Sequence, residues 1–296
     1  KGFCNVTAEV KIARAALHMW EEPCVSGEKG SGTVFFSGCN MKCICCQNYE
    51  ISRNSYGKEI TEERLIEIFR GLENQGAHNI NLVNPTHYSA QLAGTLKKYK
   101  PSVPIVYNTG GYDSVESLKN LDGSIDIYLT DIKYVSEAVS KKYSGAEDYF
   151  AVASEAVLEM QRQVGENVFD GDGIMQKGII IRHLVLPGNV SQAMRMMDWV
   201  KENLPEGTVL SLMSQYTPME KMKNHPLLGR KVRKKEYQRR VSPMVRNGGR
   251  SRLSHMPAIK TRKTAMPNEE NATAPLRLLR KASTAPTIQH RPADRA

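Results

Sequence analysis

Four of the six cysteines in this chain stand within eight residues of one another, between positions 39 and 46. Three of them, Cys39, Cys43 and Cys46, follow the spacing Cys-x3-Cys-x2-Cys. Cysteine thiolates are the usual ligands of iron–sulfur clusters and of structural zinc. Three thiolates from one tight loop can hold three irons of a [4Fe–4S] cubane and leave the fourth iron open to a substrate. The spacing therefore predicts a cluster that does chemistry.

A zinc site or a redox pair of thiols is the alternative interpretation of this segment. Structural zinc usually takes four ligands from two turns, and the sequence has no second Cys-x2-Cys pair. His78, His87 or Cys24 could complete such a site only if the fold happened to bring one of them to the loop. A disulfide framework is disfavoured, because the cysteines are crowded and a chain of 296 residues is long for a disulfide-stapled domain. Clustered thiols instead indicate a metal centre in a reducing compartment, the cytoplasm.

Charged residues in or beside apolar runs form a second group of candidates. Arg182 lies within the apolar run 179–187, where a charge is costly unless it has a partner. Asp131 and Lys133 close another apolar run, and alternation along a strand puts both on the same side. A surface ion pair is the alternative for these two residues.

Alternating strand and helix patterns must position these residues. Parallel strands need crossover connections, so the alternation predicts a parallel α/β sheet. A partial TIM-like barrel and an open doubly wound sheet both fit, and both gather functional residues at the carboxyl ends of the strands. The predicted strands are 33–37, 79–83, 104–107, 126–130, 178–186 and 208–213, and the predicted helices are 61–74 with Thr61 as N-cap, 89–99, 113–121, 147–164 and 191–203.

The net charge of +10 belongs to the C-terminal part of the chain. Residues 231–296 hold 17 of the 41 basic residues and 4 of the 31 acidic ones, so the rest of the chain is slightly acidic. Residues 240–296 lack hydrophobic periodicity, and we predict a disordered basic tail there. A nucleic-acid partner is not expected, because few aromatic residues are available for base stacking. No run of about 18 apolar residues occurs, so no membrane span is predicted.

The sequence around the cysteines resembles the radical SAM enzymes, and among them the proteins related to pyruvate formate-lyase activating enzyme. The resemblance covers about residues 1–238. It implies a partial (β/α)6 barrel, the radical SAM core, that binds a [4Fe–4S] cluster and S-adenosylmethionine (SAM). It also implies an oxidoreductase-type reaction in which SAM is cleaved reductively and the resulting 5′-deoxyadenosyl radical abstracts hydrogen. The segments that carry the resemblance are 11–22, 31–52, 79–88 and 211–218.

The same resemblance makes Cys39, Cys43 and Cys46 the iron ligands. Cys45 stands where relatives usually carry an aromatic residue, and we predict that it is not a ligand. The resemblance further implies an electron donor of the flavodoxin or ferredoxin kind. A protein substrate that carries a glycyl-radical site is implied by the activating enzymes. A non-catalytic iron–sulfur or zinc-binding module with a nucleic-acid-binding tail is the alternative function.

The resemblance assigns five more residues to the SAM site. Lys133 would neutralise the carboxylate of SAM, Asp131 would hold that lysine or the ribose, and Arg182 would point toward SAM. Asn84 and Thr86 stand where the family has a glycine-rich motif for the SAM amino group, but Gly-Gly-Glu is absent here. The alternative for these two is a turn that Asn84 begins and a helix that Thr86 caps.

The predicted organisation has three parts. Residues 1–30 form an N-terminal extension, residues 31–239 the radical SAM core and residues 240–296 the tail. Cys4 and Cys24 lie in the extension and are either remnants of a second metal site or ordinary buried thiols.

Overall fold

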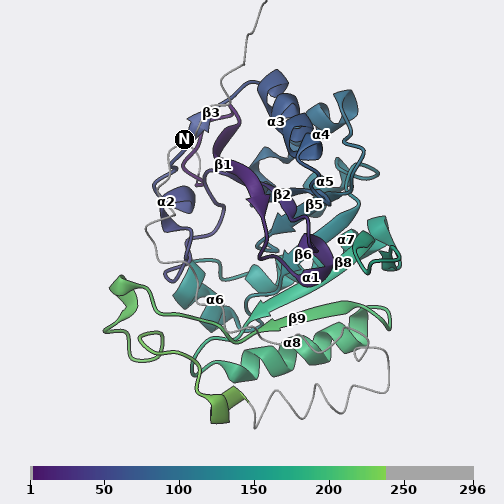
Figure 1. The fold of residues 1–296 in the computed structure, drawn as a ribbon. Coiled ribbons are helices and arrows are strands. Elements are labelled where there is room, and N and C mark those ends of the chain that lie inside the picture. Colours follow the sequence, from purple (N-terminus) through teal and green to yellow (C-terminus); the bar gives the residue numbers. More distant parts are fainter. Residues whose placement is uncertain (1–2, 238–296) are drawn as a thin grey trace, which may run out of the picture. The chain divides into compact units, whose positions relative to one another are not determined.

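The computed structural model describes residues 3–237 (Figure 1), and the predicted basic tail lies outside them. In this part of the chain the strands are β1 (Lys11–His18), β2 (Ser31–Phe36), β3 (Lys58–Glu59), β4 (Ile80–Val83), β5 (Ile105–Thr109), β6 (Ile127–Asp131), β7 (Val168–Phe169), β8 (Met175–Leu184) and β9 (Val209–Met213). The helices are α1 (Pro23–Ser26), α2 (Tyr49–Ser52), α3 (Glu62–Asn74), α4 (Ser89–Lys98), α5 (Val115–Lys119), α6 (Glu137–Ser144), α7 (Tyr149–Val164) and α8 (Val190–Asn203), with 3-10 turns η1 (Thr86–Tyr88) and η2 (Glu220–Met222).

Six strands are parallel and lie side by side in chain order, β2-β4-β5-β6-β8-β9. Right-handed crossovers between strands in this order put the connecting helices on one side of the sheet. A doubly wound sheet would reverse its strand order and carry helices on both faces. The expected partial barrel is therefore confirmed as a mixed α/β fold with an open, mostly parallel sheet.

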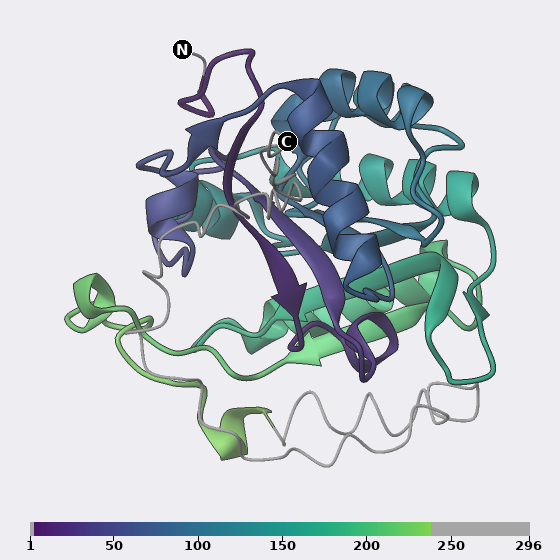
Figure 2. The ribbon, with the colours of Figure 1, turned by 45° about the horizontal axis from the view of Figure 1, so that its top comes forward.

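Two strands beside β2, at the edge of the main sheet, were not predicted from the sequence pattern. β1 pairs antiparallel with β2, and β3 pairs antiparallel with β1. Figure 2 shows β1 and β2 running side by side across the molecule. The segment of β1 is rich in alanine, which favours helix, but ladder pairing with β2 outweighs that preference. The segment 11–18, predicted as part of an extension, therefore belongs to the main sheet.

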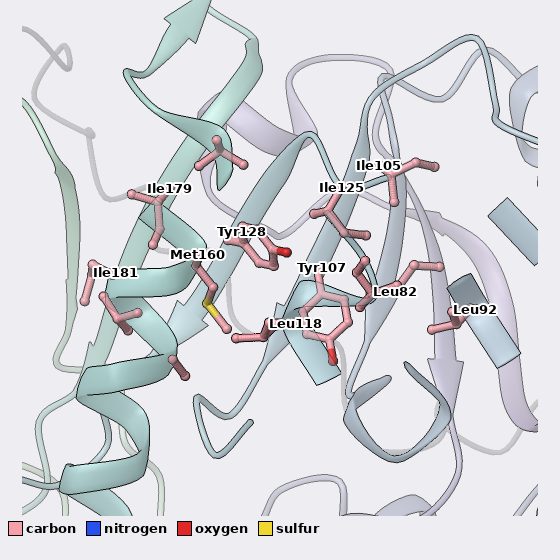
Figure 3. Packing of buried hydrophobic residues seen from close by; sticks show 14 of the residues in the cluster. Leu82, Leu92, Ile105, Tyr107, Leu118, Ile125, Tyr128, Met160, Ile179 and Ile181 are labelled. Carbon is pink, nitrogen blue, oxygen red and sulfur yellow. The ribbon is translucent and has the colours of Figure 1, made fainter. Parts of the chain in front are cut away.

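The outer face of the sheet packs against the helices. Figure 3 shows this layer, in which Tyr107 and Tyr128 from β5 and β6 lie near Leu118 and Met160 from α5 and α7. Their side chains are fully buried, so they supply the apolar contact that holds the crossovers in place. None of the helices within residues 3–237 is long and apolar enough to cross a membrane.

The inner face of the sheet is filled differently along its length. Toward the amino ends of the strands, Val106, Ile127 and Ile180 form a second apolar core with Cys24 and Val25 of α1. α1 fills this part of the inner face, where Asn79 donates to the carbonyl of Val25 at 2.7 Å, and the charged side chains lie further along, toward the carboxyl ends of the strands. Those charged residues and the cysteine loop after β2 form the candidate site.

Candidate functional site

The cysteine loop leaves β2 through a glycine that no other residue could replace without strain. Gly38 has a φ of +89°, and a Cβ on it would lie 2.7 Å from the carbonyl oxygen of Cys4. Further along the loop, the backbone N–H groups of Lys42 and Ile44 donate to the carbonyl oxygens of Ser144 and Tyr143, each at 2.9 Å. These carbonyls end α6 and would otherwise lack helical partners, so the helix end and the loop fix each other.

The thiols of this loop are partly buried and have few polar neighbours. The backbone N–H of Met41 donates to Cys39 Sγ at 3.4 Å, and Cys46 Sγ lies 3.3 Å from Ser52 Oγ. Burial raises the pKa of the Cys43 thiol to about 12, and burial also raises the pKa of Cys39. A thiolate in such a place needs a positive charge beside it, and bound iron would supply one.

The donor set fits a cluster that is bound through three cysteines of one loop. Within residues 3–237, no three Cys, His, Asp or Glu side chains are grouped as ligands of a single metal ion. In a cubane each protein thiolate binds a different iron, so its ligands need not meet at one point. Cys45 packs in the same apolar cluster as Cys39 and Cys43. All six cysteines lie in the described part of the chain, and all six are free thiols there.

The turn after β4 holds the start of the cysteine loop. Asn84 has a φ of +55°, and its backbone N–H donates to the carbonyl of Asn108 at 2.7 Å. Its Nδ2 donates to the carbonyl of Gly38 at 2.7 Å, and its Oδ1 lies 3.8 Å from Cys39 Sγ. From the same turn, His87 Nε2 lies 2.7 Å from the carbonyl of Ser37. Asn84 was predicted to face SAM, and the structure places its amide against the loop of the first cysteine.

Thr86 was predicted to act with Asn84, but it belongs to a different group of side chains. Its Oγ1 lies 3.1 Å from Thr109 Oγ1, and Thr109 donates to the Asp113 carboxylate at 2.6 Å. Tyr107 donates to the same carboxylate at 2.9 Å. Burial raises the pKa of Asp113, although these hydrogen bonds lower it in part. The structure therefore separates Thr86 from Asn84.

Asp131, Lys133 and Arg182 are brought together, as the sequence predicted for the first two. Lys133 forms an ion pair with Asp131, and Arg182 Nε donates to the other oxygen of the same carboxylate at 2.9 Å. Burial opposes the charge on Asp131, but the two cations lower its pKa below the ordinary value. Burial likewise opposes the charge on Lys133, while Asp131 raises the pKa of that lysine. The alternative for Asp131 and Lys133 was a surface ion pair, but their side chains are 14% and 30% exposed, so the pair is largely withdrawn from solvent.

Lys133 connects this group to the cysteine loop. A Cβ on Gly110 would lie 3.3 Å from Lys133 Cε and 3.4 Å from the sulfur of Met41, so lysine, glycine and cysteine loop meet at one place. Gly111 has a φ of +82°, and a Cβ there would overlap the carbonyl of Asp131. Burial is the dominant effect on the Cys43 thiol and raises its pKa. The Lys133 ammonium acts in the opposite direction and lowers that pKa in part.

Sequence reasoning missed the residues that complete the surroundings of Arg182. Its Nη1 donates to Glu21 at 3.3 Å and lies 3.8 Å from a carboxylate oxygen of Glu22. Its Nη2 donates to the side-chain oxygen of Asn108 at 2.7 Å. The signal that could have found Glu21 and Glu22 was the unmatched arginine in β8, because such a charge requires buried carboxylates elsewhere in the chain. His183, the next residue, faces the opposite side and lies 2.6 Å from the carbonyl of Ile132.

The two cysteines of the N-terminal segment lie in different apolar surroundings. Cys24 belongs to the inner core beside α1, where burial raises its pKa to about 11. Cys4 packs against the outer core. Their separate clusters favour ordinary packed thiols over a shared metal site.

Comparisons with known proteins give a family and a set of similar chains. The model of the Radical SAM superfamily matches residues 33–189. An uncharacterized protein of Methanocaldococcus jannaschii, MJ0674, is 28% identical over 249 residues, which are 81% of this chain and 68% of that protein.

Two solved structures are similar at 14% identity. One is native anSMEcpe with bound AdoMet and Cp18Cys peptide, with a TM-score of 0.49 over 71% of this chain and 56% of that one. The other is methylornithine synthase (PylB), with a TM-score of 0.44 over 59% of this chain and 50% of that one. The chain thus spans about half the length of these two proteins.

Proposed function

The chain belongs to the radical SAM superfamily, and on that premise we propose that it is an enzyme that cleaves SAM reductively at a [4Fe–4S] cluster held by Cys39, Cys43 and Cys46. One observation carries the proposal. The three thiols leave β2 in a single loop, and Lys133 connects that loop to the buried charges of Asp131 and Arg182. When bound, the cluster supplies the electron that breaks the S–C5′ bond of SAM, which yields methionine and a 5′-deoxyadenosyl radical.

In this proposal each residue has a limited task. The Met41 N–H and the Ser52 hydroxyl lie beside the sulfurs of Cys39 and Cys46 and would stabilise their thiolate forms. Lys133 would hold the carboxylate of SAM, because its ammonium lies between Asp131 and the cysteine loop.

Arg182 is better described as a positioning residue than as a direct contact. Its Nε, Nη1 and Nη2 all donate to side chains of the protein, so it fixes Asp131, which in turn holds Lys133. Asn84 would keep the first cysteine in place through its amide. A role for Thr86 toward SAM rests on its position in the sequence.

The resemblance to activating enzymes supports a finer version of the proposal. In that version the hydrogen comes from a partner protein that carries a glycyl-radical site, and the electron comes from a flavodoxin- or ferredoxin-like donor. The free thiols support a reducing compartment, the cytoplasm.

Anaerobic reconstitution tests the proposal. The protein should bind about four irons and four sulfides per chain, and the electron paramagnetic resonance signal of the reduced protein should shift when SAM is added. Dithionite and SAM should then give 5′-deoxyadenosine. Alanine at Cys39, Cys43 or Cys46 should abolish all three results, whereas the matched control Cys45→Ala should keep them. Stoichiometric zinc in place of iron, or loss of iron from Cys45→Ala, would contradict the assignment and favour the zinc-binding alternative.

A further inference from the structure

Two adjacent carboxylates of the turn between β1 and α1 point to the inner face of the sheet. The Glu21 and Glu22 side chains are 10% and 11% exposed and reach toward Arg182 of β8. The turn is fixed locally, because the backbone N–H of Glu21 donates to Ser26 Oγ at 2.9 Å. Val25 of α1, three residues after Glu22, is fully buried in the inner core. The two carboxylates are therefore held in place by the fold.

The fold itself does not require Glu22. Arg182 is already satisfied by Asp131, Glu21 and Asn108, and Glu22 Oε2 is 3.8 Å from its nearest nitrogen. That oxygen is buried and has no hydrogen-bond partner among residues 3–237. Glu22 is also the N-cap residue of α1, yet within the described chain its side chain makes no capping hydrogen bond. A carboxylate buried without such a partner is costly, so its presence needs another explanation.

A second unpartnered side chain lies beside these carboxylates. Asn81 of β4 is 0% exposed, and neither its Oδ1 nor its Nδ2 has a hydrogen-bond partner in the described part of the chain. Burial raises the pKa of the Glu21 carboxyl, and the side-chain amide of Asn81 lowers that pKa in small part. Glu21 accepts from Arg182 Nη1 at 3.3 Å and from Asn108 Nδ2 at 3.4 Å. Both hydrogen bonds are long, so lone pairs of this carboxylate remain available.

The charges of the buried side chains around Arg182 indicate which kind of ligand would satisfy Glu22. Ion pairs join three carboxylates, Glu21, Glu22 and Asp131, to two cations, Arg182 and Lys133. With all five groups charged, one negative charge is left over, so a cation matches the unpartnered oxygen of Glu22 better than an anion does. A neutral hydroxyl would leave that charge unmatched. A compact cation with several N–H donors would satisfy Glu22, the free lone pairs of Glu21 and Oδ1 of Asn81 together.

We propose that Glu21, Glu22 and Asn81 bind a primary ammonium group of the molecule from which hydrogen is abstracted. This inference rests on the proposed function, since Lys133 connects the same group of charges to the cysteine loop. It names the substrate class as an amine, whether a small molecule or a lysine side chain or amino terminus of a peptide. The rigid turn means that the carboxylates are positioned before the ligand arrives, which reduces the entropy lost on binding.

Binding of two matched probes to the cluster-loaded full chain tests the inference. n-Butylammonium and 1-butanol have the same number of non-hydrogen atoms, and their binding can be compared by saturation-transfer NMR titration under anaerobic conditions. The parent protein should bind the ammonium roughly tenfold more tightly or better, as expected of hydrogen bonds to charged groups. Equal binding of the two probes overturns the inference, and this comparison needs no variant that could fail to fold.

Variants then locate the site. Glu22→Gln should lose roughly tenfold in ammonium affinity, whereas Glu28→Gln makes the same chemical change at an exposed position of the next turn and should bind like the parent. If Glu22→Gln binds butylammonium like the parent, the probe binds elsewhere and the site is wrong. Iron content and 5′-deoxyadenosine formation are measured on the same parent preparation. If 5′-deoxyadenosine forms but the protein shows no preference for the ammonium probe, this inference alone is overturned. If the protein prefers the ammonium probe but forms no 5′-deoxyadenosine, the proposed function alone is overturned.

Discussion

Replacing Arg182 by methionine should destabilise the protein far more than replacing an exposed arginine. The guanidinium of Arg182 is 15% exposed and serves Asp131, Glu21 and Asn108. Methionine keeps much of the side-chain volume but leaves the carboxylates without their common cation. Removing one partner of a buried ion pair typically costs about 3–5 kcal/mol, because the remaining charge stays buried and uncompensated.

The exposed pair of Arg64 and Glu67 on α3 provides the control. Their side chains are 42% and 61% exposed, and pairs of this kind contribute at most about 1 kcal/mol. Urea unfolding of the metal-free proteins, followed by circular dichroism at pH 7, gives both free energies of unfolding. If Arg182→Met loses no more stability than Arg64→Met, the ion-pair network does not hold this part of the fold, and the reasoning about Glu21 and Glu22 fails with it.

The pH dependence adds an independent check on the cause. In the parent, Arg182 and Lys133 lower the pKa of Asp131 against the opposing effect of burial, so Asp131 stabilises the fold above its unfolded pKa and loses that effect as the pH falls. Without the guanidinium, burial would raise the pKa values of Asp131 and Glu21. The buried negative charges would then destabilise the fold, but only at pH values above those pKa values, where the carboxyls are ionised. The deficit of Arg182→Met should therefore be largest at pH 7 and shrink toward pH 4. A deficit that is constant with pH would indicate lost packing instead of unpaired charge.

Three further predictions concern single residues. Lys133→Met should keep the cluster but bind SAM roughly ten- to a hundredfold more weakly in titrations of the reduced protein, and unchanged affinity would remove the lysine from the site. Asn84→Gly keeps the left-handed backbone but loses the amide bond to Gly38, so iron should be lost to a chelator roughly tenfold faster, and an unchanged rate would show that the amide does not support the loop. Burial raises the pKa of Asp113, so its contribution to stability should fall as the pH rises through that pKa. The parent should therefore lose stability between pH 4 and 7 relative to Asp113→Asn. Parallel pH profiles of the two proteins would contradict this.

Most of the elements could be predicted from local patterns. Every predicted strand and helix is present, with ends shifted by at most three residues. Thr61 caps α3 as expected and accepts from the backbone N–H of Arg64 at 3.2 Å. These features depend on residues close together in sequence. By contrast, β1 forms because β2 lies beside it, and that pairing leaves no local signal in an alanine-rich segment.

The surroundings of the candidate site were harder to predict for the same reason. The need of Arg182 for a partner could be recognised from the apolar run around it, but Asp131 was paired from the sequence only with Lys133 or the ribose of SAM. Glu21 is separated from Arg182 by 161 residues and could not be found from spacing. The contact of Asn84 with Gly38 depends on a left-handed backbone at a non-glycine residue, which sequence alone does not indicate.

The long separation between Glu21 and Arg182 has a consequence for synthesis of the chain. A ribosome makes α1 and its two carboxylates long before the strand that neutralises them. Until β8 has emerged, Ile180 is absent from the inner core and the carboxylates lack the guanidinium. A nascent or prematurely ended chain that stops before β8 would thus expose Val25 and Cys24 beside unpaired charge. Such chains should be recognised by chaperones and proteases, whereas chains that extend through β8 can close the sheet.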